Sequence, residues 1–173
     1  MRRKGLRVAC LAVIGAFTLH GSPVDAGGNP FNGFIAKSKK GTYRSSVIDT
    51  DQPADNPQKY TKKVEPGDSA TFFVKVKNSG QAVFNVALEG DLGAKGFDVQ
   101  YFIGDEDVTD NYGAECQSTP IPAGGKVLIK MKVTAHPELT PGADDEIAFV
   151  VGDDSSCFDA GAYDIVWAIV KVV

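Results

Sequence analysis

The sequence predicts an all-β protein, an antiparallel β-sandwich of about seven strands. Successive segments after residue 58 alternate apolar and polar side chains with a period of two, the pattern of a strand with one buried face. Gly, Pro, Asn and Asp interrupt these segments at the short spacing typical of strand and turn units. No window of the required length has the period of an amphipathic helix. Together these observations favour a single sandwich domain at residues 59–173.

The first 26 residues have the organisation of a signal peptide. A basic segment ending at Arg7 precedes an apolar run at residues 8–19, and Ala26 follows small residues that fit a cleavage site. The apolar run is shorter than the roughly 18 residues expected of a membrane-spanning helix. We therefore expect residues 1–26 to be removed and the protein to be exported to the periplasm or the extracellular space, without a membrane span.

Residues 27–58 are predicted to form an irregular N-terminal arm. They are rich in Gly, Pro, Asn, Asp and Ser and have no sustained period, with a candidate first strand at residues 43–48. Phe31, Phe34 and Ile35 are an exception, because a disordered linker rarely keeps three large apolar side chains together. We expect these three side chains to pack on the following domain.

The strongest strand prediction covers residues 70–78, which lie between turn residues on both sides. One face of this strand would carry Ala70, Phe72, Val74 and Val76, and the other Thr71, Phe73, Lys75 and Lys77. The same alternation predicts strands at residues 82–89, 97–103, 126–133 and 146–151, with a further candidate at residues 60–65. Each alternating segment has one face suited to the core.

The last predicted strand, residues 163–173, has two apolar faces instead of one. Its second face carries Ile165, Trp167 and Ile169, with Lys171 as its only charge. Contiguous exposed apolar patches on soluble proteins tend to be functional. This face is therefore either covered by the N-terminal arm with Phe31, Phe34 and Ile35, or available as an interaction face for a protein partner or for self-association.

Removal of the signal peptide would leave two cysteines, Cys116 and Cys157. Two cysteines in an oxidising compartment usually pair, and closing a loop of about 40 residues would stabilise the protein by about 3–4 kcal/mol in the chain-entropy model. We expect this disulfide, and two separate thiols are the alternative. A zinc site is not expected, because His136 is the one histidine outside the signal peptide.

Several motifs resemble bacterial extracytoplasmic immunoglobulin-like modules. They are Pro66-Gly67 followed by Phe72-x-Val74-x-Val76-x-Asn78-x-Gly80, and Gly124-Gly125 followed by Val127-x-Ile129-x-Met131-x-Val133. The stretch Gly96-Phe97-x-Val99-x-Tyr101-x-x-Gly104 is similar to a segment of bacterial secreted repeats. The similar group includes CARDB modules, related to cell adhesion, and domains appended to secreted glycosidases. The resemblance covers about residues 60–173 and implies an immunoglobulin-like sandwich that acts as a spacer, adhesion unit or accessory domain without catalytic residues.

Charge and histidine content argue against two classes of function. Loss of four basic residues and one acidic residue with the signal peptide would change the formal net charge from -4 to -7. After residue 26 no basic run exceeds Lys39-Lys40 or Lys62-Lys63, whereas nucleic-acid binding needs clustered Lys and Arg, so no nucleic-acid partner is expected. A Ser or Cys nucleophile would have only His136 as its base and lies in no recognisable motif, so no enzyme activity is expected.

Calcium is the one cofactor that the sequence leaves open. It takes roughly six to eight oxygen ligands, and acidic residues cluster in three predicted turns, none with EF-hand spacing. The candidate ligands are Asp105, Asp107, Asp110, Asp144, Asp145, Asp153 and Asp154. Local capping of turns by these aspartates is the alternative.

Carbohydrate binding on a sandwich would require outward-facing aromatic side chains. The candidates are Phe73, Phe102, Tyr112, Phe158 and Trp167. Trp167 lies in an apolar setting that indicates packing more than a sugar platform.

The sequence therefore predicts a non-catalytic structural or interaction module of the cell envelope or extracellular space, with a protein or another envelope component as partner. The alternative is a small ligand-binding module for a glycan or calcium.

Overall fold

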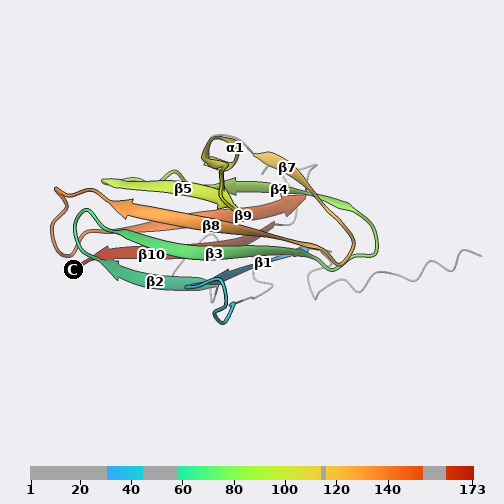
Figure 1. Ribbon diagram of the computed structural model, residues 1–173, viewed down its shortest axis with the longest axis horizontal. Coiled ribbons are helices and arrows are strands. Elements are labelled where there is room, and N and C mark those ends of the chain that lie inside the picture. The colour runs from blue at the N-terminus through green and yellow to red at the C-terminus, as the bar shows by residue number, and fades with distance from the viewer. Residues whose placement is uncertain (1–30, 45–57, 114–115, 154–162) are drawn as a thin grey trace, which may run out of the picture.

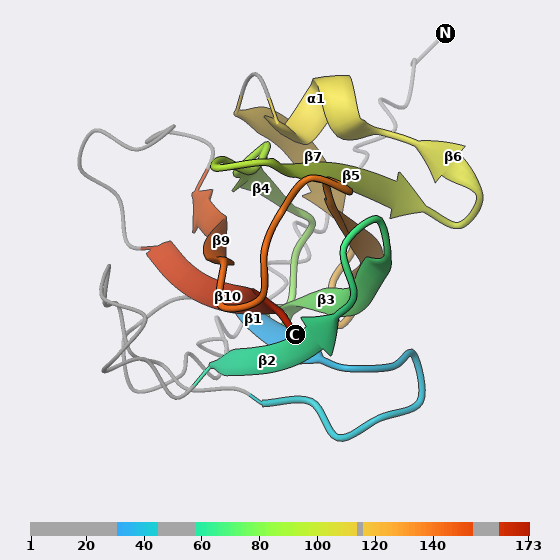
Figure 2. The same cartoon turned by 90° about the vertical axis from the view of Figure 1, so that its left-hand side faces the viewer.

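The computed structural model describes residues 31–44, 58–113, 116–153 and 163–173, and in it two β-sheets pack face to face (Figures 1 and 2). The first sheet contains, in spatial order, β1 (Phe31–Ala36), β3 (Ser69–Asn78), β8 (Lys126–Ala135), β5 (Phe97–Ile103) and β6 (Glu106–Asp107). The second contains β2 (Lys59–Val64), β10 (Tyr163–Val172), β9 (Asp144–Asp153), β4 (Phe84–Gly90) and β7 (Gln117–Ile121). One short helix, α1 (Thr109–Gly113), follows β6.

Strand directions give the sandwich an immunoglobulin-like architecture, as predicted. All neighbouring strands of both sheets are antiparallel except β2 and β10, which are parallel. The described residues form ten strands instead of about seven. The additional strands include β1, the two-residue β6 and β7, whose sequence lacks a clear alternation.

The core lies between the two inner faces and follows the predicted alternation. In β3, Phe72 and Val74 are fully buried, and they lie opposite Met131 and Ile129 of β8. Across the sandwich, Phe149 of β9 is also fully buried and its ring contacts Tyr101 of β5 and Tyr112 of α1. Full burial of each such apolar side chain contributes about 1.5–3 kcal/mol.

Part of the segment expected to be irregular is a strand. Residues Phe31–Ala36 pair antiparallel with β3, from Phe31 opposite Asn78 to Ala36 opposite Phe73. Gly33 faces inward, where a Cβ atom would lie 3.2 Å from Asp164 Oδ2 and 3.3 Å from Val151. Gly33, which suggests a turn in the sequence, thus lies in a strand where any larger side chain would force its neighbours to shift. Of the conceivable strand at residues 43–48, Arg44 forms an isolated bridge with Ile35, and residues 45–48 lie outside the described residues.

The N-terminal aromatic residues do not cover the second apolar face of β10. Phe31 and Ile35 are part of the core between the two sheets. This core lies on the side of β10 opposite to Ile165, Trp167 and Ile169. Phe34 instead lies next to Lys75 Nζ, 4.3 Å from its ring centroid. The prediction that these side chains cover the second face is therefore wrong, because the strand alternation of β1 directs them to the core and to the outer face of the first sheet.

Two buried polar side chains hold strand ends together. Asp164 Oδ2 accepts a hydrogen bond from the Gly33 N–H at 2.7 Å, and its Oδ1 accepts one from Gln58 Nε2 at 2.5 Å. Asn78 Nδ2 donates to the carbonyls of Ala82 and Ile121, and its Oδ1 accepts from the Gly80 N–H. The Asn78-x-Gly80 motif therefore fixes the turn after β3, because each buried polar group of its amide has a partner.

Candidate functional site

The outer face of the first sheet gathers lysine and aromatic side chains from four strands. Side chains alternate along each strand, so the positions between the buried residues of β1, β3, β8 and β5 all point away from the core. We call this surface the lysine-aromatic face, which comprises Phe34, Phe73, Lys75, Lys77, Phe102, Lys126, Leu128, Lys130 and Lys132.

Pairing register aligns these side chains in rows across the sheet. Lys130 of β8 lies opposite Phe73 of β3 on one side and Phe102 of β5 on the other. In the next row, Lys75 lies between Phe34 of β1 and Leu128 of β8. Cross-strand neighbours of this kind are close enough to interact. The register therefore places each of these two ammonium groups between apolar or aromatic neighbours.

Aromatic rings hold two of the ammonium groups in place. Lys130 Nζ lies 3.9 Å from the centroid of the Phe102 ring. Lys75 Nζ lies 4.3 Å from the Phe34 ring and 4.2 Å from the ring of Tyr43, which follows β1. Such cation-π contacts contribute about 0.5–1 kcal/mol each at exposed sites. They orient the lysines without neutralising their charge.

Carboxylates balance these charges only in part. Within the described ranges 31–44, 58–113, 116–153 and 163–173, none of the five lysines of the face forms an ion pair. Two aspartates lie at the margin of the face, where Asp98 contacts His136 and Asp107 accepts hydrogen bonds from Thr109. The charge of Lys130 also helps to lower the pKa of Asp107, so this lysine is partly balanced without a direct ion pair. The pKa of Lys75 is lowered, first by partial burial and then by the charges of Lys126 and Lys77.

A shallow depression of about 230 Å³ is hollowed into this face. Phe73, Phe102 and Leu128 supply its apolar lining, and Lys130 its positive charge. Lys39 and the β5–β6 turn, with Gly104 and Asp105, complete the lining. The depression thus combines an apolar lining with cationic groups and one carboxylate.

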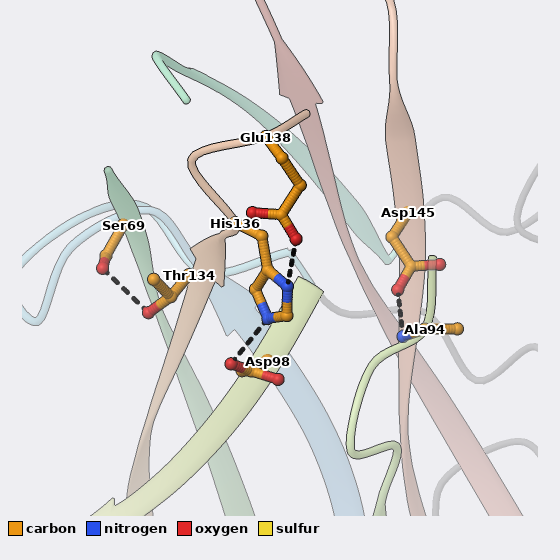
Figure 3. A network of polar contacts seen from close by, with 7 residues as sticks. All are labelled: Ser69, Ala94, Asp98, Thr134, His136, Glu138 and Asp145. Carbon is orange, nitrogen blue, oxygen red and sulfur yellow. Dashed lines mark hydrogen bonds and ion pairs between the residues drawn. The ribbon is translucent and has the colours of Figure 1, made fainter. Parts of the chain in front are cut away.

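His136 lies just after β8 and contacts two carboxylates (Figure 3). Its Nε2 is 2.8 Å from Asp98 Oδ2 and its Nδ1 is 3.2 Å from Glu138 Oε1. The hydrogen bond with Asp98 is the main cause of a raised His136 pKa, and Glu138 adds to it. The Ser69 hydroxyl, also drawn in Figure 3, shares a hydrogen bond of 2.9 Å with the Thr134 hydroxyl. In this arrangement both ring nitrogens of His136 are occupied by carboxylates instead of a hydroxyl nucleophile.

Several of the calcium candidates have local partners. Asp107 Oδ1 accepts hydrogen bonds from the N–H and hydroxyl of Thr109 at the start of α1, which lower its pKa. Asp144 pairs with Lys171 at 3.3 Å, and Asp145 accepts a hydrogen bond from the Ala94 N–H (Figure 3). Asp105 and Asp110 are exposed.

A calcium site stays a prediction. Asp153 ends β9, but its side chain and all of Asp154 lie outside the described residues. Among the residues that the structure describes, no group of three or more His, Cys, Asp or Glu side chains could hold a metal ion.

The predicted interaction face on β10 is largely buried. Ile165 and Ile169 are 5% and 8% exposed, and Trp167 is half-buried. Trp167 Nε1 is buried without a hydrogen-bond partner among the described residues.

Other predictions fall partly beyond the described residues. The signal peptide, Phe158 and Cys157 lie outside them, so the disulfide with Cys116 stays a prediction. Tyr112, predicted to be outward-facing, is 4% exposed and packs in the core. No helix in the described part of the chain is long and apolar enough to cross a membrane.

The lysine-aromatic face was missed because the basic residues are not consecutive in the sequence. Lys75 and Lys77 on β3, and Lys126, Lys130 and Lys132 on β8, occur at even spacings and meet only when the two strands pair. The signal was present in the alternation itself, since lysine recurs on the polar face of two strands that are distant in sequence.

No protein-family model and no curated protein sequence matches the chain. A family 123 glycoside hydrolase from Clostridium perfringens matches 84% of the chain with a TM-score of 0.51 and 10% identity. The match covers 27% of that enzyme, so the chain spans about a quarter of its length. The N-terminal domain of PorA matches 81% of the chain, and 96% of its own length, with a TM-score of 0.48 and 11% identity.

A CARDB domain of the PF1109 protein from Pyrococcus furiosus, solved with di-metal ions, is also among the similar structures. It matches 64% of the chain, and 79% of its own length, with a TM-score of 0.38 and 14% identity. The immunoglobulin-like sandwich that the predicted resemblance implies is confirmed by the two packed sheets of the structure.

Proposed function

We propose that this protein is an exported, non-catalytic interaction module of the cell envelope or extracellular space, and that it binds an acidic partner through the lysine-aromatic face. The observation that carries the proposal is the crowding of five lysines on two paired strands, none of which forms an ion pair within the described part of the chain. The whole sequence is acidic, with a formal net charge of -4, so this basic surface contrasts with the overall charge.

Crowding of like charges has an electrostatic cost that an acidic partner would remove. Lysines directly opposite or diagonal to one another across a sheet destabilise the pairing. Lys77 lies opposite Lys126, and both are exposed. A surface of one charge also attracts oppositely charged partners and raises their association rate. The arrangement therefore suits binding better than stability.

One observation and two predictions support an exported module that does not catalyse a reaction. His136 has a carboxylate on each ring nitrogen, which leaves no imidazole nitrogen to accept a proton from a nucleophile. The predicted signal peptide at residues 1–26 supports export. The predicted Cys116–Cys157 disulfide suits an oxidising compartment.

The proposal is tested by retention of material from an envelope extract on the immobilised protein. The variant Lys75→Gln/Lys130→Gln removes two charges from the face. The control variant Lys63→Gln/Lys95→Gln removes the same charge from exposed positions on β2 and on the β4–β5 connection. We expect a component that is retained by the protein and the control variant, released by moderate salt, and lost by the face variant.

A Trp167→Ser variant separates this proposal from binding through β10. Retention that survives Lys75→Gln/Lys130→Gln but is lost in Trp167→Ser would contradict the proposal and return the interaction surface to the last strand. Turnover of a substrate by the purified protein would contradict its non-catalytic part.

A further inference from the structure

We propose that the lysine-aromatic face binds an anionic polysaccharide, a chain of sugar rings that carries carboxylate or sulfate groups. This inference rests on the proposed function and names the chemistry of its partner. The row in which Lys130 lies between Phe73 and Phe102, at the depression of about 230 Å³, is the observation on which it depends.

The lining of the depression matches the two kinds of surface on an acidic sugar. A sugar ring has an apolar face of C–H groups and a periphery of hydroxyl and acidic groups. Phe73, Phe102 and Leu128 offer only apolar contact, because none of them has a polar side-chain atom. Lys130 is paired with Phe73 on one side and Phe102 on the other, and its ammonium group lies 3.9 Å from the centre of the Phe102 ring, close to where an acidic group of a bound sugar would lie.

A carboxylate in the lining adds a feature that a simple polyanion does not need. Asp105 lines the depression together with Lys39 and Lys130. A carboxylate accepts hydrogen bonds and repels anions, so beside two lysines it suits a ligand that has hydroxyl donors as well as negative charge. Polysaccharides with acidic groups have both.

The lysines extend well beyond the depression and along the strands. Strand geometry gives about 3.4 Å per residue, so Lys126 and Lys132 on β8 are separated by roughly 20 Å. Lys75 and Lys77 form a second row on β3, about 4.8 Å to the side. A linear polymer that runs along β8 would therefore contact several ammonium groups at once, and a small single anion would not.

Acidic peptides and acidic proteins fit this surface less well. An extended peptide is usually bound by adding a strand at a sheet edge, but the backbone groups of β3 and β8 are paired with neighbours on both sides. Protein interfaces are enriched in Arg and depleted in Lys, whereas the lysine-aromatic face has five lysines and no arginine. Lysine acts as a point charge on a flexible stem, which suits acidic groups in a repeating polymer.

The test is affinity electrophoresis of the folded protein through native gels that contain one polymer each. Polygalacturonate supplies carboxylates on sugar rings, dextran sulfate supplies sulfates, dextran is the neutral polysaccharide and polyglutamate is the acidic polypeptide. We expect retardation by polygalacturonate, dextran sulfate or both, and less by polyglutamate at equal charge concentration. The two acidic polysaccharides distinguish carboxylate from sulfate recognition.

The lysine variant measures the electrostatic part of binding. Lys75→Gln/Lys130→Gln should weaken retardation roughly tenfold or more, while Lys63→Gln/Lys95→Gln should differ little from the unmodified protein. The face variant makes fewer contacts with the polymer's acidic groups and therefore releases fewer counterions when it binds. The slope of log affinity against log salt should thus become shallower by about one to two.

The aromatic variant separates sugar recognition from simple charge attraction. Phe73→Leu/Phe102→Leu keeps an apolar side chain of similar size but removes both rings, and its melting temperature is compared first with that of the unmodified protein. We expect binding to polygalacturonate or dextran sulfate to weaken several-fold with an unchanged salt slope. Unchanged affinity in this variant would overturn the polysaccharide proposal.

The failures of the two proposals are distinguishable. Equal or tighter binding of polyglutamate would overturn the polysaccharide inference and leave the acidic partner of the proposed function. Absence of binding to both acidic polysaccharides, together with face-dependent retention of an envelope protein, would overturn only the further inference. Absence of both kinds of binding would overturn both.

Discussion

The two outer faces of the sandwich differ in what they expose. On the first sheet, the outward positions carry lysines and half-exposed aromatic rings. On the second sheet, the outward positions of β10 carry Ile165, Trp167 and Ile169, and the two isoleucines are buried. The sequence alone favours the reverse assignment. An apolar second face on the last strand suggests an interaction surface, and alternating lysines on other strands suggest an ordinary solvated face.

The comparison shows that hydrophobicity alone does not locate an interaction surface. An apolar row can be part of the folded interior even when it lies on the outer side of a sheet, and its removal from water then stabilises the fold. Charges that are crowded and unpaired have the opposite effect, since they cost stability and gain a favourable interaction only when an opposite charge arrives. We therefore expect the β10 face to contribute stability, and we propose the lysine-aromatic face as the binding surface.

The largest expected difference in stability comes from placing a charged side chain on each of the two faces. Ile169→Asp would bury an unpaired carboxylate and should lower the free energy of unfolding by about 3–5 kcal/mol. Leu128→Asp is the matched change on the first sheet and introduces a carboxylate opposite Lys75. It should change the free energy of unfolding by less than about 1 kcal/mol. Urea unfolding of both variants measures the difference. Equal destabilisation would contradict the contrast between the faces.

A smaller loss of stability is expected from Asp164→Ala, which removes a hydrogen-bonded link between the two sheets. The Asp164 carboxylate binds the Gly33 N–H of β1 and the Gln58 amide, so its removal should cost about 2–3 kcal/mol. Amide hydrogen exchange should become faster in β1, the strand at one edge of the lysine-aromatic face. Asp98→Ala, at an exposed carboxylate, serves as the control and should leave β1 protection unchanged.

The smallest effect is the pH dependence of His136 at the margin of the lysine-aromatic face. Its pKa is raised above the ordinary value, mainly by Asp98, so the contacts stabilise the fold most when the imidazole is protonated. This contribution should be complete below about pH 6.5, the unfolded value, and disappear as the pH rises through the folded pKa.

Proton NMR titration of the His136 ring checks this prediction. Asp98→Asn should shift the His136 pKa downward and reduce the pH dependence of the melting temperature. A pKa at or below the ordinary histidine value in the unmodified protein would contradict the observed contacts.

Local alternation was sufficient to predict much of the sandwich. Ala70, Phe72, Val74 and Val76 share one buried face, as the alternation predicts, because a period of two is a property of each strand alone. The strand β1 was not predicted, since Gly33 resembles a turn residue until its close approach to Asp164 and Val151 is known. Tyr112 was misplaced because it belongs to a helix of a single turn.

The candidate site depended on information that a linear pattern does not contain. Lys75 and Lys130 are distant in sequence and come together only through the register of β3 and β8. Phe73 and Phe102 were expected to face outward, and the structure places one on each side of Lys130. The residue types of the site were therefore predictable, but their juxtaposition was not.

The most direct test of the binding face is backbone NMR of the protein during titration with oligogalacturonate at low salt. We predict that the perturbed amides cluster on the outward-facing positions of β3, β8 and β5, around Phe73, Lys130 and Phe102, and that the Lys75→Gln/Lys130→Gln variant loses these shifts. Perturbations that cluster instead on β10, around Trp167, would contradict the assignment of binding to the lysine-aromatic face.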